Sequence, residues 1–339
     1  MAGDLKIGSL TGFVDEFESA RSIILSEPNI ARVVAVVVTY FPEKKALASQ
    51  IIQLRKQVSH VVLVDNTPIE RPNQAEENID FITPIRLGEN VGLAKGINVG
   101  VLSAREMGAT HVLLMDQDSI PQDGMVEKLI AGLTQAQKTY PVAAAGPTFL
   151  DSRGATFTPF WRVGFPRNKP ASQSKDEGFI FTDCLITSGC LISLEAFQQI
   201  GEMNEHLFID NVDLEWCLRA RYMGWRLVGI PDAILSHQLG DTHILAPWYL
   251  RILGKKVVIQ HNSTRLYYII RNRILLYRMK QVPLLWKLQD AIRIPGKFVI
   301  GISIGGSKWD AMKAMLHGCW HGLINVAGEK PQPVRSGGK

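Results

Sequence analysis

The sequence has few cysteines and no long hydrophobic run, and both absences narrow the class of protein. Its 339 residues include four cysteines, no two of which form a CxxC pair. This arrangement argues against a disulfide framework or a structural zinc site and indicates a reducing compartment. No stretch reaches the roughly 18 uncharged apolar residues of a membrane-spanning helix, and the apolar run at 298–304 is short and interrupted by glycine. The opening MAGDLKIGSL lacks the apolar core of a signal peptide, so we expect a cytoplasmic protein.

A large excess of one charge sign is absent as well. The formal net charge is +5, from 37 Lys and Arg against 32 Asp and Glu, which is small for a protein that binds nucleic acid. We therefore expect no nucleic-acid partner. The hydrophobic fraction of 46% fits a globular protein with a sizeable core. The positive charge gathers between Lys255 and Arg293, where nine basic residues stand against one acid, Asp290.

Strand and helix patterns alternate through the first half of the chain. Residues 33–38 (VVAVVV) form a β-branched run, typical of a strand buried on both faces of a parallel sheet. Further strands are predicted at 60–64, 85–87 and 112–115, with helices at about 42–58 and 93–107. This alternation predicts an α/β fold with a doubly wound, mostly parallel sheet flanked by helices. Such sheets bind ligands at the carboxyl ends of their strands.

The second half is predicted to be less regular. Residues 149–177 are rich in Pro, Gly, Arg and Ser, which indicates a long irregular segment. A strand-like stretch follows at 184–193, and a helix begins near Asp213. Two further helices are predicted at 265–279 and 309–325.

Two carboxylates follow the predicted strand at 112–115. Asp116 and Asp118 flank Gln117 on a tight turn, where they can hold a hard divalent cation that also binds phosphate oxygens. The alternative is a solvated, aspartate-rich turn that leads into Pro121. The position at a strand end favours the cation site. His237, which follows another apolar segment, is a candidate ligand of the same metal or of a diphosphate.

Polar residues follow the first two strands as well. A carboxylate at Asp65 can accept the N3–H of a uracil or thymine ring, with Asn66 beside it. Backbone groups near Thr39 and Tyr40 can complete such a base pocket. The alternative is an Asx turn, because Asp-Asn-Thr-Pro is strong turn chemistry.

The segment NVGLAKGIN opens the predicted helix at 93–107 with repeated small residues. Asn90, Gly92 and Lys95 lie at or near the helix start, where backbone amides suit a phosphate group. Packing of the helix against the sheet through small residues explains the same pattern equally well.

The segment FIDNVDLEWCLRA at 208–220 places three acids near one helix start. A helix amino terminus favours the ionised form of a carboxylate, so Asp213 can act as a base. Capping by Asp210 or Asp213 is the alternative, but three acids exceed what capping requires. The candidates for acceptor binding are Thr187, Ser188, Gly189, Asp210, Glu215 and Trp216.

Together these motifs resemble glycosyltransferase family 2, the inverting enzymes with a GT-A fold. The similarity runs from about Val33 to Arg278 and is carried by VVVTYFP, VDN, NVGLAKGIN, DQDS, TSGCLIS and VDLEWCLRARYMGW. Within the family the chain is most similar to bacterial rhamnosyltransferases, through MDQDS, FIDNVDLEWCLRA, SHQLGD and RLYYIIRN.

The resemblance implies roles for particular residues. The metal-binding DxD falls on Asp116 and Asp118, with Mg²⁺ or Mn²⁺ as cofactor, and the base falls on Asp213. Val212 stands where the family usually has Glu, a form that rhamnosyltransferases of this type share. Nucleotide-sugar binding is expected of Thr39, Tyr40, Asp65, Asn66, Asn90, Gly92, Lys95, Asp116 and Gln117.

The resemblance also implies the reaction. It implies transfer of L-rhamnose from dTDP-β-L-rhamnose to a hydroxyl of a glycan or lipid-linked acceptor, as in O-antigen or lipopolysaccharide synthesis. A single displacement would give an α-linked product. The expected domains are an N-terminal extension (1–30), a GT-A catalytic domain (31–250, with nucleotide binding in 31–122 and acceptor binding in 123–250), a basic amphipathic helical region (251–330) and a flexible tail (331–339).

Several alternatives stay open. The acceptor could be a glycolipid, the donor a UDP-sugar, or the chain a non-catalytic sugar-binding scaffold, and a homo-oligomer is equally open. A nucleotidyltransferase would need a phosphate loop rich in Gly and basic residues where TYFPEK stands. The basic helices within 255–325 are expected to lie on the inner face of the membrane. In the other interpretation, their apolar residues Tyr267, Ile270, Ile274 and Tyr277 only pack on the catalytic domain.

Overall fold

The computed structural model describes residues 31–68, 80–151, 156–171, 178–237, 243–245, 251, 257–304 and 307–331. The extension predicted for residues 1–30 and nearly all of the tail predicted for 331–339 lie outside these ranges. From Ala31 onward the chain forms one compact unit.

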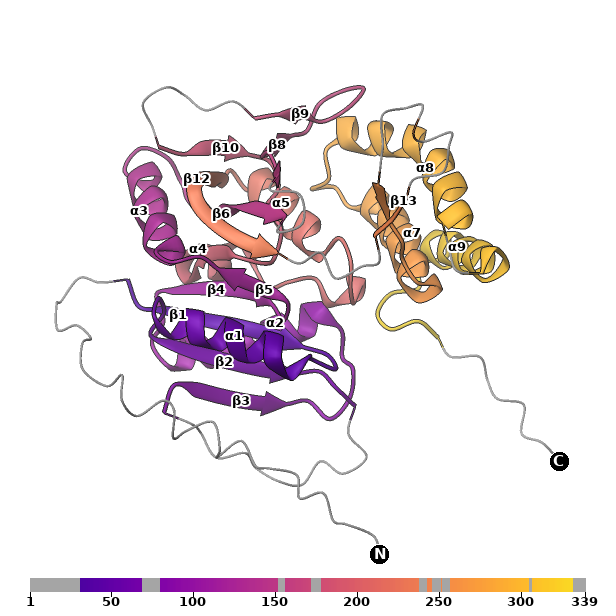
Figure 1. Ribbon diagram of the computed structural model, residues 1–339. Coiled ribbons are helices and arrows are strands. Elements are labelled where there is room, and N and C mark those ends of the chain that lie inside the picture. The colour runs from indigo at the N-terminus through magenta and orange to yellow at the C-terminus, as the bar shows by residue number, and fades with distance from the viewer. Residues whose placement is uncertain are drawn as a thin grey trace, which may run out of the picture. The chain divides into compact units, whose positions relative to one another are not determined.

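The amino-terminal half of the main sheet is parallel. Its strands are β1 (Val33–Thr39), β2 (His60–Asp65), β3 (Ile82–Arg86) and β4 (His111–Asp116), in the spatial order β3-β2-β1-β4 (Figure 1). Each lies within a few residues of the predicted strand, and β1 and β2 carry the β-branched runs that are typical of buried parallel strands. All four carboxyl ends therefore meet at one edge of the sheet.

The other half of the sheet is mixed. β11 (Cys190–Ser193) runs antiparallel between β4 and β6 (Val142–Asp151), and β12 (Arg226–His237) lies parallel to β6. The short strands β5 (Ser119–Pro121) and β10 (Ile180–Thr182) pair with β12, and β7 (Thr156–Phe157) pairs with β6. Two separate hairpins are β8 (Trp161–Arg162) with β9 (Lys169–Pro170), and β13 (His243–Leu245) with β14 (Val257–Ile259). The segment predicted to be irregular thus contains several short strands.

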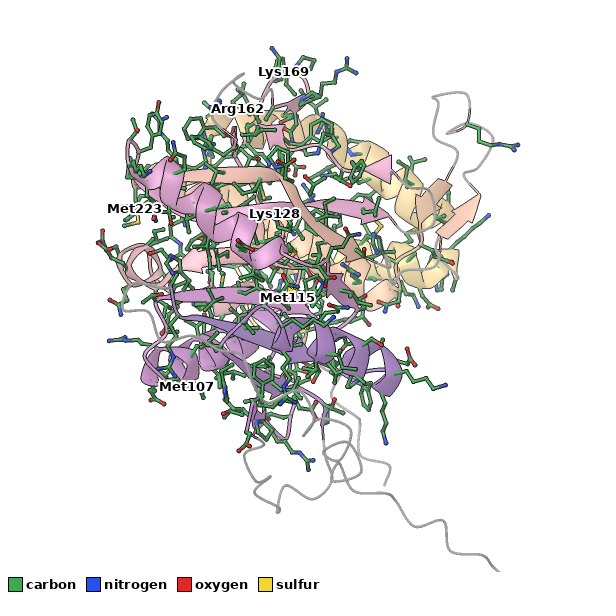
Figure 2. All side chains as sticks on the ribbon, turned by 60° about the vertical axis from the view of Figure 1, so that its left-hand side comes forward. Met107, Met115, Lys128, Arg162, Lys169 and Met223 are labelled. Carbon is green, nitrogen blue, oxygen red and sulfur yellow. The ribbon has the colours of Figure 1, made fainter. Side chains whose placement is uncertain are left out.

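Helices cover both faces of the sheet. The helices α1 (Lys44–Arg55) and α3 (Met125–Gln137) pack on the face that carries Val33 and Val37, and Met115 of β4 lies in that layer (Figure 2). The helices α2 (Leu93–Glu106), α4 (Leu194–Ile200) and α5 (Val212–Tyr222) pack on the face of Val34 and Val36. A Cβ atom at Gly100 would lie 2.3 Å from Val36 Cγ1, so the small residues of α2 allow its close packing on β1.

Within the described residues after 257, three helices follow: α7 (Ser263–Arg278), α8 (Leu284–Ile304) and α9 (Lys308–Leu323). They confirm the predicted helical extension, and the sheet with its flanking helices confirms the predicted α/β class. Tyr267 and Ile270 are completely buried, so α7 packs against the rest of the protein. Among the described residues, no helix combines the length and apolar character needed to cross a membrane.

Candidate active site

The carboxyl ends of β1, β2 and β4 are joined by side-chain hydrogen bonds. The Gln117 side chain exchanges two bonds with the Tyr40 backbone: its Oε1 accepts from Tyr40 N–H at 2.7 Å, and its Nε2 donates to Tyr40 O at 3.2 Å. The Thr39 hydroxyl donates to Asp65 Oδ1 at 3.4 Å. The same oxygen accepts the Thr67 amide at 3.0 Å, so the Asx turn is present. The structure thus brings together four predicted nucleotide-sugar residues.

Two asparagines link β2 to the start of α2. Asn66 Nδ2 donates to Asn90 Oδ1 at 3.0 Å, and Asn66 Oδ1 accepts the Val91 amide at 2.8 Å. The helix start itself is covered by Phe208. A Cβ atom at Gly92 would lie 2.7 Å from Phe208 O, so close packing requires this glycine, which has a φ of +88°. The structure therefore assigns Gly92 a role in helix packing. Lys95 is exposed in the first turn of α2.

The turn Asp116-Gln117-Asp118 is held from two sides. Gln50, completely buried on α1, donates through Nε2 to Asp116 O at 2.5 Å and to Ser119 O at 2.6 Å. The Asp116 amide donates to Ser188 Oγ at 3.3 Å. Sequence reasoning missed Gln50, and the signal that could have found it is a polar residue on the apolar face of a helix. Because its partners belong to the turn, Gln50 positions the aspartate pair.

Asp213, in the first turn of α5, shares this site. The pKa of Asp116 is raised to about 7, chiefly by burial and then by the negative charges of Asp118 and Asp213, against the positive charge of Arg265. Asp118 and Asp213, predicted for metal binding and catalysis, therefore both lie within electrostatic reach of Asp116. Burial also raises the pKa of Asp213, although hydrogen bonds from the backbone at Leu214 (2.7 Å) and Thr187 oppose the rise.

The predicted acceptor segment 187–189 contacts Asp213 through a backbone hydrogen bond from Thr187. Thr187 and Ser188 are buried, and the Gly189 amide donates to Leu114 O at 2.7 Å. Gly189 has a φ of +76°, and a Cβ atom there would lie 2.6 Å from Pro147 Cγ. This glycine turns the chain so that Thr187 meets the Asp213 carboxylate.

The loop before α5 has a strained backbone. Phe208, Asp210 and Asn211 have φ values of 62°, 64° and 61°, in the left-handed region that residues other than glycine rarely adopt. Each such residue costs on the order of 1–3 kcal/mol and persists only where surrounding contacts hold it. The loop leads directly to Asp213.

Helix α7 supplies those contacts. Asn272, completely buried, donates from Nδ2 to three carbonyl oxygens of the loop: Leu207 at 2.9 Å, Ile209 at 2.7 Å and Asp210 at 2.8 Å. Arg271 Nη2 donates to Leu207 O at 2.9 Å. Sequence reasoning did not assign this role to the Arg-Asn pair of RLYYIIRN. We call Arg271 and Asn272 the α7 clamp.

Arg265, about two turns nearer the start of α7, adds a positive charge. Its guanidinium pairs with Asp210 Oδ1 at 3.2 Å and lowers the pKa of Asp116. Asp210 is therefore a partner of Arg265 at the site.

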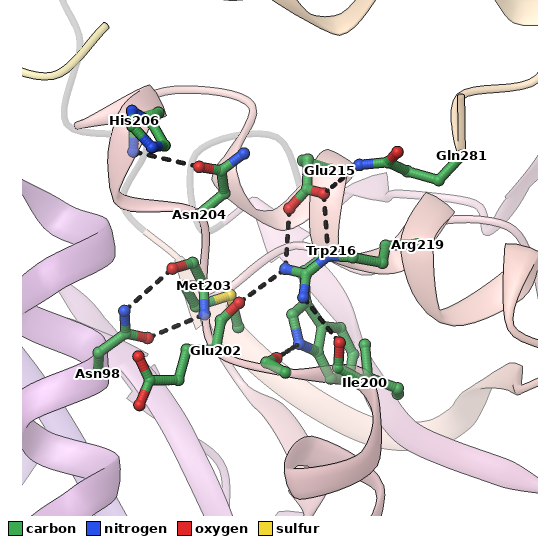
Figure 3. Close-up of polar contacts among 11 residues, drawn as sticks. Asn98, Ile200, Glu202, Met203, Asn204, His206, Glu215, Trp216, Arg219 and Gln281 are labelled. Atoms are coloured by element: carbon green, nitrogen blue, oxygen red, sulfur yellow. Dashed lines mark hydrogen bonds and ion pairs between the residues drawn. The ribbon is translucent and has the colours of Figure 1, made fainter. Parts of the chain in front are cut away.

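Two predicted acceptor residues lie in the protein interior instead (Figure 3). Glu215 and Trp216 are each 1% exposed. Glu215 pairs with Arg219 at 2.9 Å and accepts from Gln281 Nε2 at 3.0 Å. Trp216 Nε1 donates to Gly201 O at 3.0 Å. Both residues anchor α5, so we do not include them in the site.

The predicted metal ligand His237 ends β12. Its backbone pairs with Ser119 of β5, next to Asp118. Its side chain lies outside the described part of the structure, and its role as a ligand stays a prediction.

Two aromatic rings stand at the end of β1. Tyr40 and Phe41 are 47% and 65% exposed, and their ring centroids lie 4.7 Å apart in an edge-to-face arrangement. The Phe41 amide donates to Thr67 Oγ1 at 2.9 Å, which ties the rings to the loop after β2. Either exposed ring offers an apolar face near Asp65 on which a nucleobase can stack.

Comparisons with known proteins agree with the motifs. Residues 35–201 match the family described as Glycosyl transferase family 2. Over 301 residues the chain is 31% identical to dTDP-rhamnosyl transferase RfbF of Shigella flexneri, covering 88% of this chain and 97% of that protein. It is 23% identical over 319 residues to an N-acetylglucosaminyl-diphospho-decaprenol L-rhamnosyltransferase of Mycobacterium tuberculosis, covering 82% and 96%.

Solved structures were compared as well. The mannosyltransferase PcManGT from Pyrobaculum calidifontis, in complex with GDP-Man and Mn²⁺, aligns with a TM-score of 0.49 at 12% identity. That alignment covers 93% of this chain and 94% of the mannosyltransferase.

Proposed function

The chain belongs to glycosyl transferase family 2, and on that basis we propose that it transfers L-rhamnose from dTDP-β-L-rhamnose to an acceptor hydroxyl with inversion. Family membership confirms the predicted glycosyltransferase class and, together with the observed sheet, the predicted GT-A fold. The donor is inferred from the names of the two relatives, a dTDP-rhamnosyl transferase and an L-rhamnosyltransferase.

The proposal depends on the convergence of Asp116, Asp118 and Asp213 at the carboxyl edge of the sheet. An inverting displacement needs one base and a positive charge that stabilises the departing diphosphate. Asp213 would act as the base, and Asp116 and Asp118 would hold the cation that supplies the positive charge. The exposed rings of Tyr40 and Phe41 then mark the side on which the nucleobase binds.

Asp213 is suited to act as the base. Burial raises the pKa of its carboxyl, which makes the carboxylate a stronger proton acceptor. In the proposed reaction it takes the proton of the acceptor hydroxyl while the hydroxyl oxygen bonds to the anomeric carbon. The bond from that carbon to the diphosphate oxygen breaks, and its electron pair leaves with dTDP. One displacement inverts the carbon, so a β-linked donor yields an α-linked product.

Asp116 and Asp118 fit a divalent cation. Carboxylate oxygens are the ligands that Mg²⁺ and Mn²⁺ prefer. The pKa of Asp116 is raised first by burial and then by the negative charges of Asp118 and Asp213, and a cation would offset both effects. When bound, the cation would neutralise the diphosphate of the donor. No cluster of three or more His, Cys, Asp and Glu side chains within the described ranges could hold a metal ion. Donor phosphates, and His237 as predicted, would complete the coordination.

Cation binding is expected to tighten as the pH rises to about 7, the pKa of Asp116. The carboxylate must lose its proton to bind, and a pKa raised above the usual value keeps that proton on at mildly acidic pH. Below pH 7, affinity for Mn²⁺ should fall by up to about tenfold for each pH unit, and above it should level off. Calorimetric titration with Mn²⁺ at several pH values measures this, and equal affinities across the range would contradict the assignment. Asp116→Asn should remove the dependence.

Replacing Phe41 with Ala is expected to weaken donor binding. Stacking of a base on an aromatic ring contributes about 1–3 kcal/mol, so the KM for the donor should rise roughly tenfold while kcat changes little. Initial rates of dTDP release at varied donor concentration provide both constants. Phe157, which is similarly exposed at 58% on β7, is the matched control. An unchanged KM in Phe41→Ala would remove the rings from the donor site.

We extend the proposal to the acceptor and its place in the cell. The acceptor is a lipid-linked glycan of O-antigen or lipopolysaccharide type, held at the inner face of the cell membrane. The name of the Mycobacterium tuberculosis relative, which specifies a diphospho-decaprenol acceptor, supports a lipid carrier. A glycolipid acceptor is the alternative.

A panel of nucleotide sugars tests the donor. Release of free nucleotide is measured with and without Mg²⁺ or Mn²⁺. The proposal predicts turnover of dTDP-rhamnose that depends on the cation. Turnover of UDP-sugars without turnover of dTDP-rhamnose would overturn it.

A further inference from the structure

The exposed face of α8 is apolar. Leu284, Leu285, Leu288, Ile292 and Val299 are between 43% and 70% exposed. Leu285, Leu288, Ile292 and Val299 recur at helical spacing, so they form one stripe along the helix. A stripe of this kind normally faces a protein core. Here it faces outward.

Three charged side chains of α8, those of Lys287, Asp290 and Lys297, point the other way, whereas Arg293 is exposed. Asp290 is buried, where it pairs with Arg273 of α7 and Lys297 of α8 and accepts the Tyr277 hydroxyl at 2.8 Å. Lys287 Nζ donates to Met279 O at 2.8 Å. The helix thus reverses the usual arrangement, with ion pairs inside and hydrocarbon outside.

Helix α9 continues the apolar surface. Trp309, Leu316, Trp320 and Leu323 are between 53% and 61% exposed and recur at helical spacing. Lys313 lies over the Trp309 ring, with Nζ at 4.9 Å from the centroid. Of the twenty large hydrophobic side chains that are exposed in the described residues, ten lie between 284 and 324. We call the outward faces of α8 and α9 the α8–α9 surface.

A cationic pocket adjoins α8. The pocket has a volume of about 710 Å³ and lies between the β8–β9 hairpin and Arg293. Arg167 and Lys169 line it together with the aromatic rings of Trp161 and Phe165, and none of its lining residues is acidic. Figure 2 shows Lys169 at the outer edge of the structure. Such a pocket suits a phosphate group.

We propose that the α8–α9 surface binds the face of an anionic phospholipid bilayer, with the cationic pocket taking a headgroup phosphate. Helices that lie in a membrane interface carry apolar and tryptophan side chains on one face and cations beside them, as these do. The inference deepens the proposed function, on whose lipid-borne acceptor it rests. It replaces the broader prediction of membrane contact through 255–325, because α7 is buried.

Charge favours a bilayer over a second copy of the chain. The exposed charged side chains of α8 and α9 are the cations Arg293, Lys308 and Lys313 and one acid, Asp310. A symmetric dimer through this surface would bring like charges together. An anionic membrane instead attracts each cation near its surface.

Vesicle co-sedimentation of the full chain tests the proposal. We expect binding to vesicles of phosphatidylcholine with phosphatidylglycerol and weaker binding to pure phosphatidylcholine. The variant Leu288→Gln/Ile292→Gln should bind vesicles at least about tenfold more weakly than the wild type, because it removes hydrocarbon from the interface. Arg167→Gln/Lys169→Gln should instead reduce the preference for anionic vesicles several-fold.

Matched variants separate the possible results. Leu102→Gln/Phe157→Gln changes two side chains of similar exposure (55% and 58%) on α2 and β7 and should bind as the wild type does. Asp213→Asn should bind vesicles normally while losing transfer, so failure of the proposed activity can be told apart from failure of this surface. Wild-type binding by Leu288→Gln/Ile292→Gln would overturn the proposal. The proposal would also be overturned if sedimentation equilibrium showed that the wild type is a dimer and that this variant is a monomer.

Discussion

Replacing Asp213 with Asn is expected to lower kcat by about 10²- to 10⁴-fold, the usual contribution of a general base. The amide has nearly the same shape as the carboxylate and keeps an oxygen to accept the Leu214 amide, so α5 should stay in place. It cannot take the proton of the acceptor hydroxyl. Steady-state release of dTDP in the presence of acceptor measures the loss.

Controls show whether the loss of kcat in Asp213→Asn comes from loss of the base. The KM for the donor and the affinity for Mn²⁺ should stay within about twofold, because Asp213 is not assigned to the nucleotide or the cation. Asp232→Asn, which changes an exposed acid on β12, should leave kcat unchanged. A kcat for Asp213→Asn within tenfold of the wild type would mean that another group is the base. If wild type and variant both fail to turn over any donor, the chain is a sugar-binding scaffold.

Replacing Asn272 with Leu should have the second largest effect. Leucine fills a similar volume but donates no hydrogen bond, so the carbonyl oxygens of Ile209 and Asp210 lose the Asn272 donor, while Leu207 O keeps its bond from Arg271. A buried polar group left without a partner costs about 1–3 kcal/mol, and the loop is expected to relax away from its left-handed conformations. A displacement of the base by about 1 Å can lower a rate 10²-fold, so we expect a loss in kcat of that order.

The pattern of constants distinguishes positioning from simple destabilisation. The proposed nucleobase pocket at the ends of β1 and β2 does not depend on Asn272, so the KM for the donor should change little in Asn272→Leu. The pH–rate profile should also shift, because the surroundings of Asp213 change. Arg278→Ala, which removes an exposed side chain bonded to Leu323 O at 2.7 Å, is the control on the same helix. Normal kcat in folded Asn272→Leu would contradict the α7 clamp.

The parallel half of the sheet could be predicted because its signal is local. The run at β1 and the polar residues at the ends of β2 and β4 are neighbours in sequence, and the fold only has to bring those ends to one edge. The convergence of Asp116 and Asp118 with Asp213 also follows from this geometry together with the family motif.

Residues whose partners lie far along the chain could not be predicted in this way. Gln50 bonds to Asp116 and Asn272 bonds to Leu207, separations of 66 and 65 residues, and nothing local marks either contact. Gln50 is a single polar residue on the buried side of α1, and Asn272 stands beside the equally buried Arg271 on α7. That pattern locates a buried hydrogen bond without identifying its partner.

Helix geometry explains the correction at Glu215 and Trp216. Successive residues of an α-helix are about 100° apart, so Glu215, two positions after Asp213, points to the opposite side. Trp216 lies on nearly the same side as Asp213 but about one turn further along α5, where it packs against Phe197 in the core. Asp213 faces the site, and its neighbours face the core and Arg219. Closeness in sequence to the base therefore did not place them at the acceptor.

Helix α8 was missed for a different reason. Pro295 lies inside it and Gly301 follows, both of which argue against a helix from sequence alone. Packing overrides these local preferences, because Phe298 and Ile302 fit against the apolar side chains of α7 and α9. The outward apolar stripe became visible only once that packing was known.

The configuration of the product tests the central claim most directly. Purified protein is incubated with dTDP-β-L-rhamnose, Mn²⁺ and an acceptor, and the new anomeric centre is assigned by nuclear magnetic resonance. One displacement assisted by Asp213 predicts an α-linked rhamnoside. A β-linked rhamnoside would show retention of configuration, which a single displacement cannot produce, and would contradict the account.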